Sequence, residues 1–147
     1  MIKILLAASL LSTLSMFSQG GSLDTSFGTG GKVTTSINSG ADIAYATVLQ
    51  SDGKILVSGT TNSSISGKDF FCIRYNTDGT LDTSFGTNGI ATFDLQGGSD
   101  DVAYAMSLLS DGNILLAGFS DDGSNKNAAI IRITSNGTLD TTFGTAG

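Results

Sequence analysis

The sequence predicts an all-β chain in which one antiparallel sheet unit occurs twice in tandem. The first observation is a repeat: the heptapeptide Leu-Asp-Thr-Ser/Thr-Phe-Gly-Thr begins at Leu23, Leu81 and Leu139, and each copy starts 58 residues after the one before. A fixed period of this length is typical of a unit that buries its apolar faces against copies of itself. The second observation is composition, because the chain has 20 Gly and no Pro, and all of its acids are Asp, which favours turns over helix. We therefore expect strands and turns without long helices.

The N-terminus has the three parts of an export signal. Lys3 supplies the positive charge, an apolar run covers residues 4–14, and small or polar residues lead to Gln19. We expect residues 1–18 to be a signal peptide and the protein to be secreted or held at the cell surface. The alternative is a short membrane anchor, but the run is shorter than the roughly 20 apolar residues that span a bilayer. No membrane insertion is expected after the signal is removed.

Comparison of the two copies defines the strands of the unit. Residues 44–50 and 54–60 are β-rich runs joined by Ser-Asp-Gly, in which Gly53 can adopt a positive φ and close a tight hairpin. A third run covers residues 70–76, and a fourth covers residues 90–94, directly after the heptapeptide. The sequence thus predicts four strands per repeat.

Several of these strands are apolar on both faces, which indicates a sheet held between neighbouring sheets, as in the blades of a β-propeller. Within a repeat region over residues 19–147, we expect blade one at residues 44–94 and a partial blade two at residues 103–147. Residues 32–37 follow the first heptapeptide as the fourth strand follows the second, and they predict an N-terminal closing strand. The predicted fold is all-β and β-propeller-like, but incomplete and open, with about two blades.

The connections whose length differs between the copies are predicted to be loops. They cover residues 37–43 and 94–102, and residues 60–69 and 119–127. Loops on a rigid scaffold are where binding usually occurs, so the face that carries them is a candidate binding face. The candidate ligand-facing residues are Asn62, Ser64, Lys68, Asp121, Asp122, Asn125 and Lys126. The alternative is that these segments are solvated linkers, since Ser, Asn and Gly suit both roles and we expect no aromatic platform.

The heptapeptide is predicted to be structural. Its Leu and Phe would fill the space between blades, its Asp would cap backbone N–H groups, and its Gly would turn the chain. The alternative is a metal site at Asp24, Asp82 or Asp140, but each turn offers one carboxylate without a second acidic ligand nearby.

The residues needed for common catalytic sites are missing, and we expect no enzyme activity. The chain has no His and no Glu, so neither a Ser-His-Asp triad nor an imidazole metal ligand can form. The single Cys72 corresponds to Ile130 of the second copy, in an apolar strand, and is predicted to be a small core residue without a disulfide. The net charge of −6 disfavours nucleic acid as a partner.

Four further Asp residues, which lie in or beside predicted loops, are also considered as possible metal ligands. Asp100, Asp101, Asp121 and Asp122 are predicted to keep loops solvated, and a Ca²⁺ site is the alternative. No other cofactor is expected.

The repeat resembles the delta-60 repeat family of secreted bacterial proteins. The resemblance rests on Asp-Gly-Thr-Leu-Asp-Thr-Ser-Phe-Gly-Thr-Asn-Gly at residues 78–89 and on Gln-Ser-Asp-Gly-Lys-Ile-Leu-Val-Ser-Gly at residues 50–59. It implies propeller or propeller-like arrays in exported proteins whose biochemical activity is generally unassigned. The chain departs from the family pattern in having two full repeats plus a third heptapeptide, with no C-terminal sorting domain.

Two explanations of the open fold follow. The chain is either the first part of a longer, truncated reading frame, or copies associate head to tail, with residues 32–37 completing the next copy's second blade. The function expected is that of a secreted, non-catalytic scaffold that binds or displays an extracellular glycan or protein. The alternative is a fragment of a metal-dependent propeller hydrolase or lyase.

Overall fold

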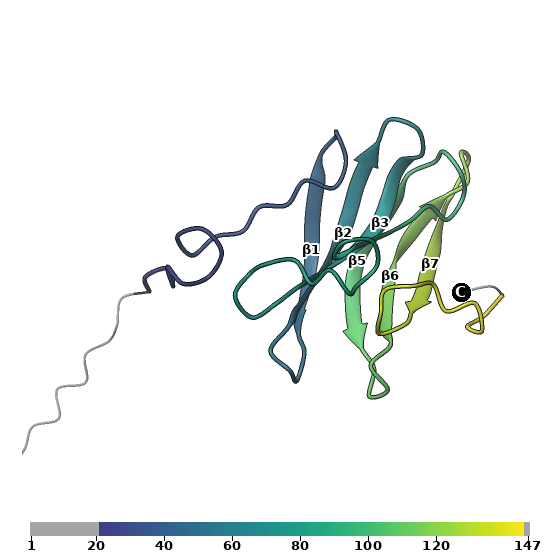
Figure 1. Cartoon of the computed structure of the whole chain (residues 1–147). Helices are drawn as coiled ribbons and strands as arrows, with labels where there is room; N and C mark the ends of the chain where they lie inside the picture. Colours follow the sequence, from purple (N-terminus) through teal and green to yellow (C-terminus); the bar gives the residue numbers. More distant parts are fainter. Residues whose placement is uncertain (1–20, 146–147) are drawn as a thin grey trace, which may run out of the picture.

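The computed structural model describes residues 21–145, so the expected signal peptide lies outside the described residues. Within this range the chain forms seven strands and no helix (Figure 1). The strands are β1 (Asp42–Leu49), β2 (Ile55–Ser63), β3 (Gly67–Tyr75), β4 (Ile90–Phe93), β5 (Asp101–Leu108), β6 (Ile114–Asp121) and β7 (Lys126–Ile133).

The strands form two open antiparallel sheets, which confirms the predicted fold class. The first sheet has the order β1-β2-β3-β4 and the second has the order β5-β6-β7. The sheets stack face to face, with β5 against β1, β2 and β3 of the first sheet (Figure 1). Each sheet is one repeat, since equivalent residues of the two copies occupy equivalent strands.

The predicted tight hairpins are present in both sheets. Gly53 has a φ of 82° and Gly112 a φ of 85°, a conformation that glycine adopts without steric cost. The Gln50 N–H donates to the Lys54 carbonyl at 2.8 Å, and the Asp52 carboxylate accepts the Lys54 N–H at 3.1 Å. Backbone and side chain therefore close the same turn.

The loops between the second and third strands are shorter than predicted. Residues 60–63 and 67–69 continue the β2–β3 ladder, so that only residues 64–66 lie between the strands. In the second sheet β6 likewise extends to Asp121 and β7 begins at Lys126. The difference in length between the copies predicted loops here, but the backbone hydrogen bonds of a hairpin continue to its turn whatever the side chains.

The main core lies between the two sheets. Leu56, Phe70 and Cys72 of the first sheet form one cluster with residues of the second sheet that include Ile114 and Leu116. Cys72 is fully buried, and this burial raises the pKa of its thiol to about 12, which confirms its predicted packing role. Ile130, the counterpart of Cys72 in the second repeat, is 50% exposed. The second sheet covers the face of the first sheet that carries Cys72, whereas no described sheet covers the face of the second sheet that carries Ile130.

The prediction that residues 32–37 form a closing strand is wrong for the described chain. Lys32 forms an isolated bridge with Gly28, and residues 33–37 belong to no sheet. The segment lies along the face of the first sheet that points away from the second, where Val33 and Ile37 pack against the cluster of Phe71 and its neighbours. Among the described residues it meets the face of a sheet and not a free strand edge, so ladder hydrogen bonds do not form.

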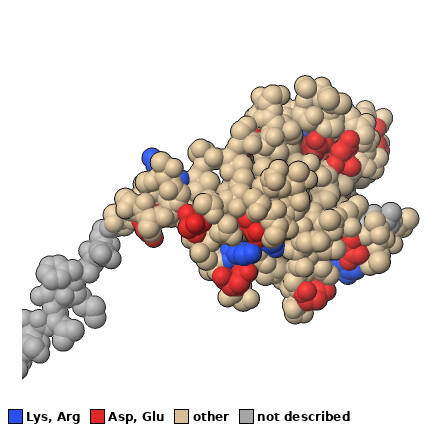
Figure 2. Space-filling view, viewed as in Figure 1, with Lys and Arg blue, Asp and Glu red and all other residues tan. Residues whose placement is uncertain are grey.

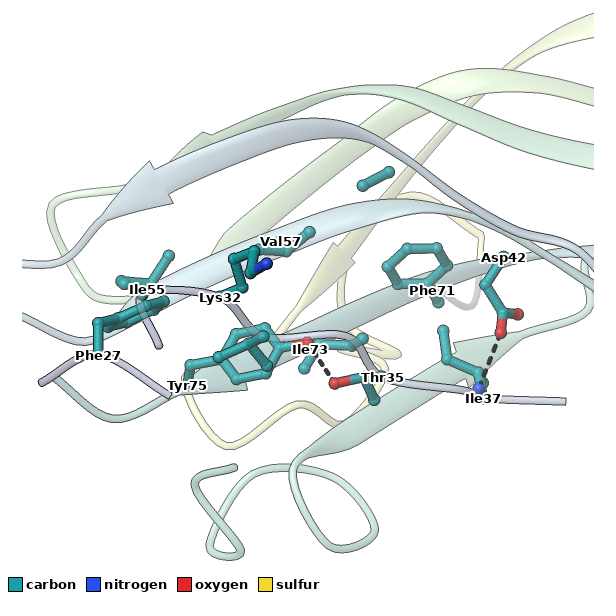
Figure 3. Close-up of a pocket in the computed structure, with 13 residues that line it drawn as sticks. Phe27, Lys32, Thr35, Ile37, Asp42, Ile55, Val57, Phe71, Ile73 and Tyr75 are labelled. Carbon is teal, nitrogen blue, oxygen red and sulfur yellow. Dashed lines mark hydrogen bonds between the residues drawn. The ribbon is translucent and has the colours of Figure 1, made fainter. Parts of the chain in front are cut away.

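A groove remains between this segment and the first sheet. Its volume is about 320 Å³, and Phe27, Thr35, Val57, Phe71 and Tyr75 are among the residues that line it (Figure 3). The Thr35 and Tyr75 hydroxyls are hydrogen-bonded to each other across it at 2.7 Å.

The second heptapeptide has the structural role that was predicted. Phe85 is fully buried in the core between the sheets. The Asp82 carboxylate accepts hydrogen bonds from the Ser84 N–H at 3.1 Å and the Ser84 hydroxyl at 2.7 Å. Gly86 turns the chain with a φ of 53°, and its N–H donates to the Asn136 carbonyl of the second repeat at 2.8 Å. The motif therefore fastens one repeat to the next.

The Asp82 carboxylate is neutralised by basic side chains. Its Oδ2 accepts from Arg74 Nε and from Lys54 Nζ, each at 2.7 Å. The same guanidinium donates to the Ser135 carbonyl of the second repeat at 2.6 Å and lies 4.7 Å from the centre of the Phe85 ring. These partners leave the carboxylate no free role as a metal ligand.

Candidate functional site

Each repeat carries a β-bulge at the same tyrosine. Ala44 pairs with Gly59 and Ala46 with Ser58, so Tyr45 has no partner across the ladder. The second sheet repeats this at Tyr104, between Ala103 and Ala105. An extra residue in one strand bends it and redirects its side chain, and such bulges are frequent at functional sites.

The sequence around each bulge makes it sterically feasible. A Cβ added to Gly59 would lie 1.9 Å from the Ile43 carbonyl oxygen, and one added to Gly118 would lie 1.8 Å from that of Val102. Real atoms cannot approach so closely. Each bulge therefore requires a glycine on the neighbouring strand, opposite the alanine that precedes the unpaired tyrosine.

The two bulges place their tyrosines side by side on the surface. The ring centres of Tyr45 and Tyr104 are 5.1 Å apart at an interplanar angle of 68°, and the Phe119 ring lies 6.0 Å beyond Tyr104. Lys126 Nζ lies 4.6 Å from the centre of the Phe119 ring. The tyrosines are 45% and 53% exposed. We call Tyr45, Tyr104 and Phe119 the aromatic row.

The aromatic row corrects the expectation that no aromatic platform is present. That expectation considered only the loops, whereas the row comes from strands β1, β5 and β6. The sequence signal for the row is Ala-Tyr-Ala, which occurs in both copies at residues 44–46 and 103–105. Exposed aromatic rings at equivalent positions offer flat apolar faces, and the tyrosine hydroxyls add hydrogen-bonding groups.

Of the seven predicted ligand-facing residues, Lys126 lies beside the row, with its Nζ 4.6 Å from the centre of the Phe119 ring. Asn62, Lys68, Asp121 and Lys126 lie on strands, while the others lie in the turns. Both turns, β2–β3 and β6–β7, lie at the same end of the sheets (Figure 1), as expected for one loop face.

Several of these polar side chains form ion pairs or hydrogen bonds with other groups of the protein. Lys68 Nζ forms an ion pair with Asp100, which raises the pKa of Lys68 and lowers that of Asp100. The Asp122 carboxylate accepts the N–H groups of Asn125 and Ser124 at 2.7 and 2.9 Å, and these bonds lower its pKa. These side chains therefore help to build their own loops.

The four acids taken as one group occupy different environments. Asp101 is fully buried at the start of β5, so its predicted role as a loop solubiliser is wrong. Asp100 is paired with Lys68, and Asp121 accepts the Gly123 N–H at 2.8 Å. Figure 2 shows acidic side chains scattered over one face of the molecule without a continuous charged patch.

Comparison with family models gives two matching segments. Residues 50–85 and 109–143 match the model described as "Domain of unknown function (DUF5122) beta-propeller". Both segments are therefore similar to a β-propeller repeat of unknown function. Each matched segment of the repeats runs from the turn before the second strand, through the third, to the heptapeptide. Comparisons with curated proteins and with solved structures found no match.

The matched family is described as one of unknown function and assigns no chemistry to the repeats. Among the described residues, no helix has the length and apolarity needed to cross a membrane. The features that the fold leaves without a structural explanation are the exposed aromatic row and, at the junction of the repeats, a group of three carboxylates.

Proposed function

We propose that the protein is a secreted, non-catalytic scaffold that binds an extracellular glycan through the aromatic row. The observation that carries the proposal is the pair of bulges that sets Tyr45 and Tyr104 in contact, each about half exposed. Secretion rests on the three-part signal in residues 1–18. A delta-60 type of repeat would fit this role as a rigid support.

Exposed aromatic rings leave apolar surface in contact with water, which a ligand can cover. A tyrosine can bury 150–250 Å² of surface, roughly, and burial of apolar area contributes about 25 cal/mol per Å². A sugar ring has an apolar C–H face and polar hydroxyls at its rim, which complements a tyrosine ring and its hydroxyl. Lys126, beside Phe119, adds a cationic donor at one end of the row.

The absence of catalysis is supported by the side chains available. The chain has neither His nor Glu, and burial raises the pKa of its single thiol to about 12. The Asp residues of the heptapeptides that have basic partners, Asp82 and Asp140, are held in ion pairs. The chain therefore lacks His, the residue that most often acts as a general base near neutral pH.

The test is affinity electrophoresis of the mature chain in gels that contain soluble polysaccharides of different composition. We expect one polysaccharide class to retard the protein, and the Tyr45→Ala/Tyr104→Ala variant to lose at least tenfold in affinity. Ile65→Ser is the control, because Ile65 is 91% exposed at the β2–β3 turn, and it should bind normally.

Two results would contradict the proposal. One is the absence of retardation by any polysaccharide with folded protein, which would leave a protein ligand as the better reading of the row. The other is retention of wild-type affinity in the double tyrosine variant, which would place binding elsewhere.

A further inference from the structure

Three carboxylates meet where the first sheet joins the second. They belong to Asp69 in β3, Asp94 directly after β4 and Asp101 at the start of β5, and one oxygen of each lies within 4.8 Å of the others. Asp69 is 6% exposed and Asp101 is fully buried, whereas Asp94 is exposed. We call these residues the junction acids.

Part of this group lacks hydrogen-bond donors. Asp69 Oδ2 accepts the Ser66 hydroxyl at 2.6 Å, and Asp101 Oδ2 accepts the Leu95 N–H at 2.7 Å. The Oδ1 atoms of both residues are buried without a partner, and so is the hydroxyl oxygen of Ser120, which lies opposite Asp101 in the β5–β6 ladder. Buried charged oxygens without partners are costly and usually indicate a missing ion or water.

The first repeat shows that the fold does not require this arrangement. Asp42 is the counterpart of Asp101, and there both oxygens are used: one accepts the Thr61 hydroxyl and the other the Ile37 N–H. The counterpart of Asp94 is Ser36, and the counterpart of Asp69 in the second repeat is Asn127. The excess of acids is therefore specific to the junction between the two repeats.

No basic side chain of the described residues forms an ion pair with the junction acids. Lys68, the nearest in sequence to Asp69, is paired with Asp100. Burial, Asp94 and Asp101 together raise the pKa of Asp69, which reflects the unfavourable negative charge. A bound cation would remove this cost.

We propose that the junction acids bind a calcium ion that ties the two repeats together. Calcium takes oxygen ligands at about 2.3–2.6 Å, so two oxygens on one ion lie no more than about 5 Å apart, in agreement with the spacing of the three carboxylates. Ser120 Oγ is a further candidate ligand. Asp94 leaves the site open to solvent, and an affinity of roughly 10⁻⁴ to 10⁻³ M, the range of extracellular calcium modules, is expected.

The experiment uses the mature chain, freed of metal and titrated with CaCl₂ by calorimetry and by thermal unfolding. The test variants are Asp69→Asn and Asp94→Ser, each of which introduces the residue that the other copy of the repeat already has, so both should fold. The control is Asp122→Asn, an exposed acid of the β6–β7 turn. MgCl₂ at equal ionic strength controls for screening.

We expect saturable calcium binding by the wild type and by Asp122→Asn, with a rise in Tm of about 5 °C at 10 mM calcium. Asp69→Asn and Asp94→Ser should each weaken binding at least tenfold and lose most of the rise. Folded wild type that neither binds calcium nor gains in Tm would overturn the proposal. So would binding that survives in Asp69→Asn, or an equal effect of magnesium.

Discussion

Replacement of Asp82 by Asn tests whether the heptapeptide fastens the repeats through its ion pairs. The carboxylate accepts hydrogen bonds from Lys54, Arg74 and Ser84, and the Asp82 and Arg74 side chains are only 9% and 10% exposed. The amide would keep the shape of the side chain but remove its charge. Arg74 would then be left buried without a counter-charge, in a position where it also holds the Ser135 carbonyl.

Loss of one partner of a buried ion pair costs roughly 3–5 kcal/mol. We expect a loss of about 3 kcal/mol in the free energy of unfolding, the lower end of that range, because Lys54 is 31% exposed and retains some solvation. The third heptapeptide provides the matched control. Asp140 pairs with Arg132 alone, at side-chain exposures of 13% and 26%, since Asn113 occupies the position of Lys54. Asp140→Asn should cost about 1 kcal/mol.

Urea unfolding at pH 7, followed by far-ultraviolet circular dichroism, measures both losses. The pH dependence gives an independent check, because hydrogen bonds from Lys54 and Ser84 hold the pKa of Asp82 well below its ordinary value of 3.8. A depressed carboxyl pKa stabilises the folded state above the ordinary value, and this stabilisation is lost as the pH falls below it. The difference between wild type and Asp82→Asn should therefore be constant near neutral pH and shrink below about pH 4. Equal losses in the two variants, or a difference independent of pH, would refute the reasoning.

Four further predictions follow from the same structure. Gly59→Ala should lower the stability by about 3 kcal/mol, because its Cβ would lie 1.9 Å from the Ile43 carbonyl oxygen; thermal unfolding measures this, and an unchanged Tm would contradict the bulge. The Cys72 thiol, fully buried, should react with a maleimide only after unfolding in guanidinium; modification of the native protein would show that the core opens. Metal-free Asp69→Asn should unfold at higher urea concentration than wild type at pH 7, since the raised pKa of Asp69 means that its charge destabilises the fold; a lower midpoint would argue against this. If residues 32–37 pair with β7 of another copy, light scattering should give a mass above that of a monomer, reduced by Thr34→Pro, and a folded, monodisperse monomer would exclude head-to-tail association.

The candidate sites were less accessible to prediction than the fold, and particular residues show why. Tyr45 and Tyr104 occupy the same position in the two copies of Ala-Tyr-Ala, but no sequence pattern predicts that a bulge turns both outward and into mutual contact. In the sequence Asp101 forms one group with its neighbour Asp100. In the structure Asp101 is buried at the start of β5, whereas Asp100 forms an ion pair with Lys68. In both cases the outcome depends on how the second sheet stacks on the first.

The sequence by itself determined the repeat, the strand content and the glycine-closed turns, because these depend on period, local propensity and permitted backbone angles. It also determined that Cys72 is a core residue and that the heptapeptide is structural. Only the tertiary structure decided that residues 32–37 lie on a sheet face without joining a ladder, and that Asp69, Asp94 and Asp101 converge. Such features arise between sheets, where distances are set by the packing of residues far apart in the chain and no local pattern records them.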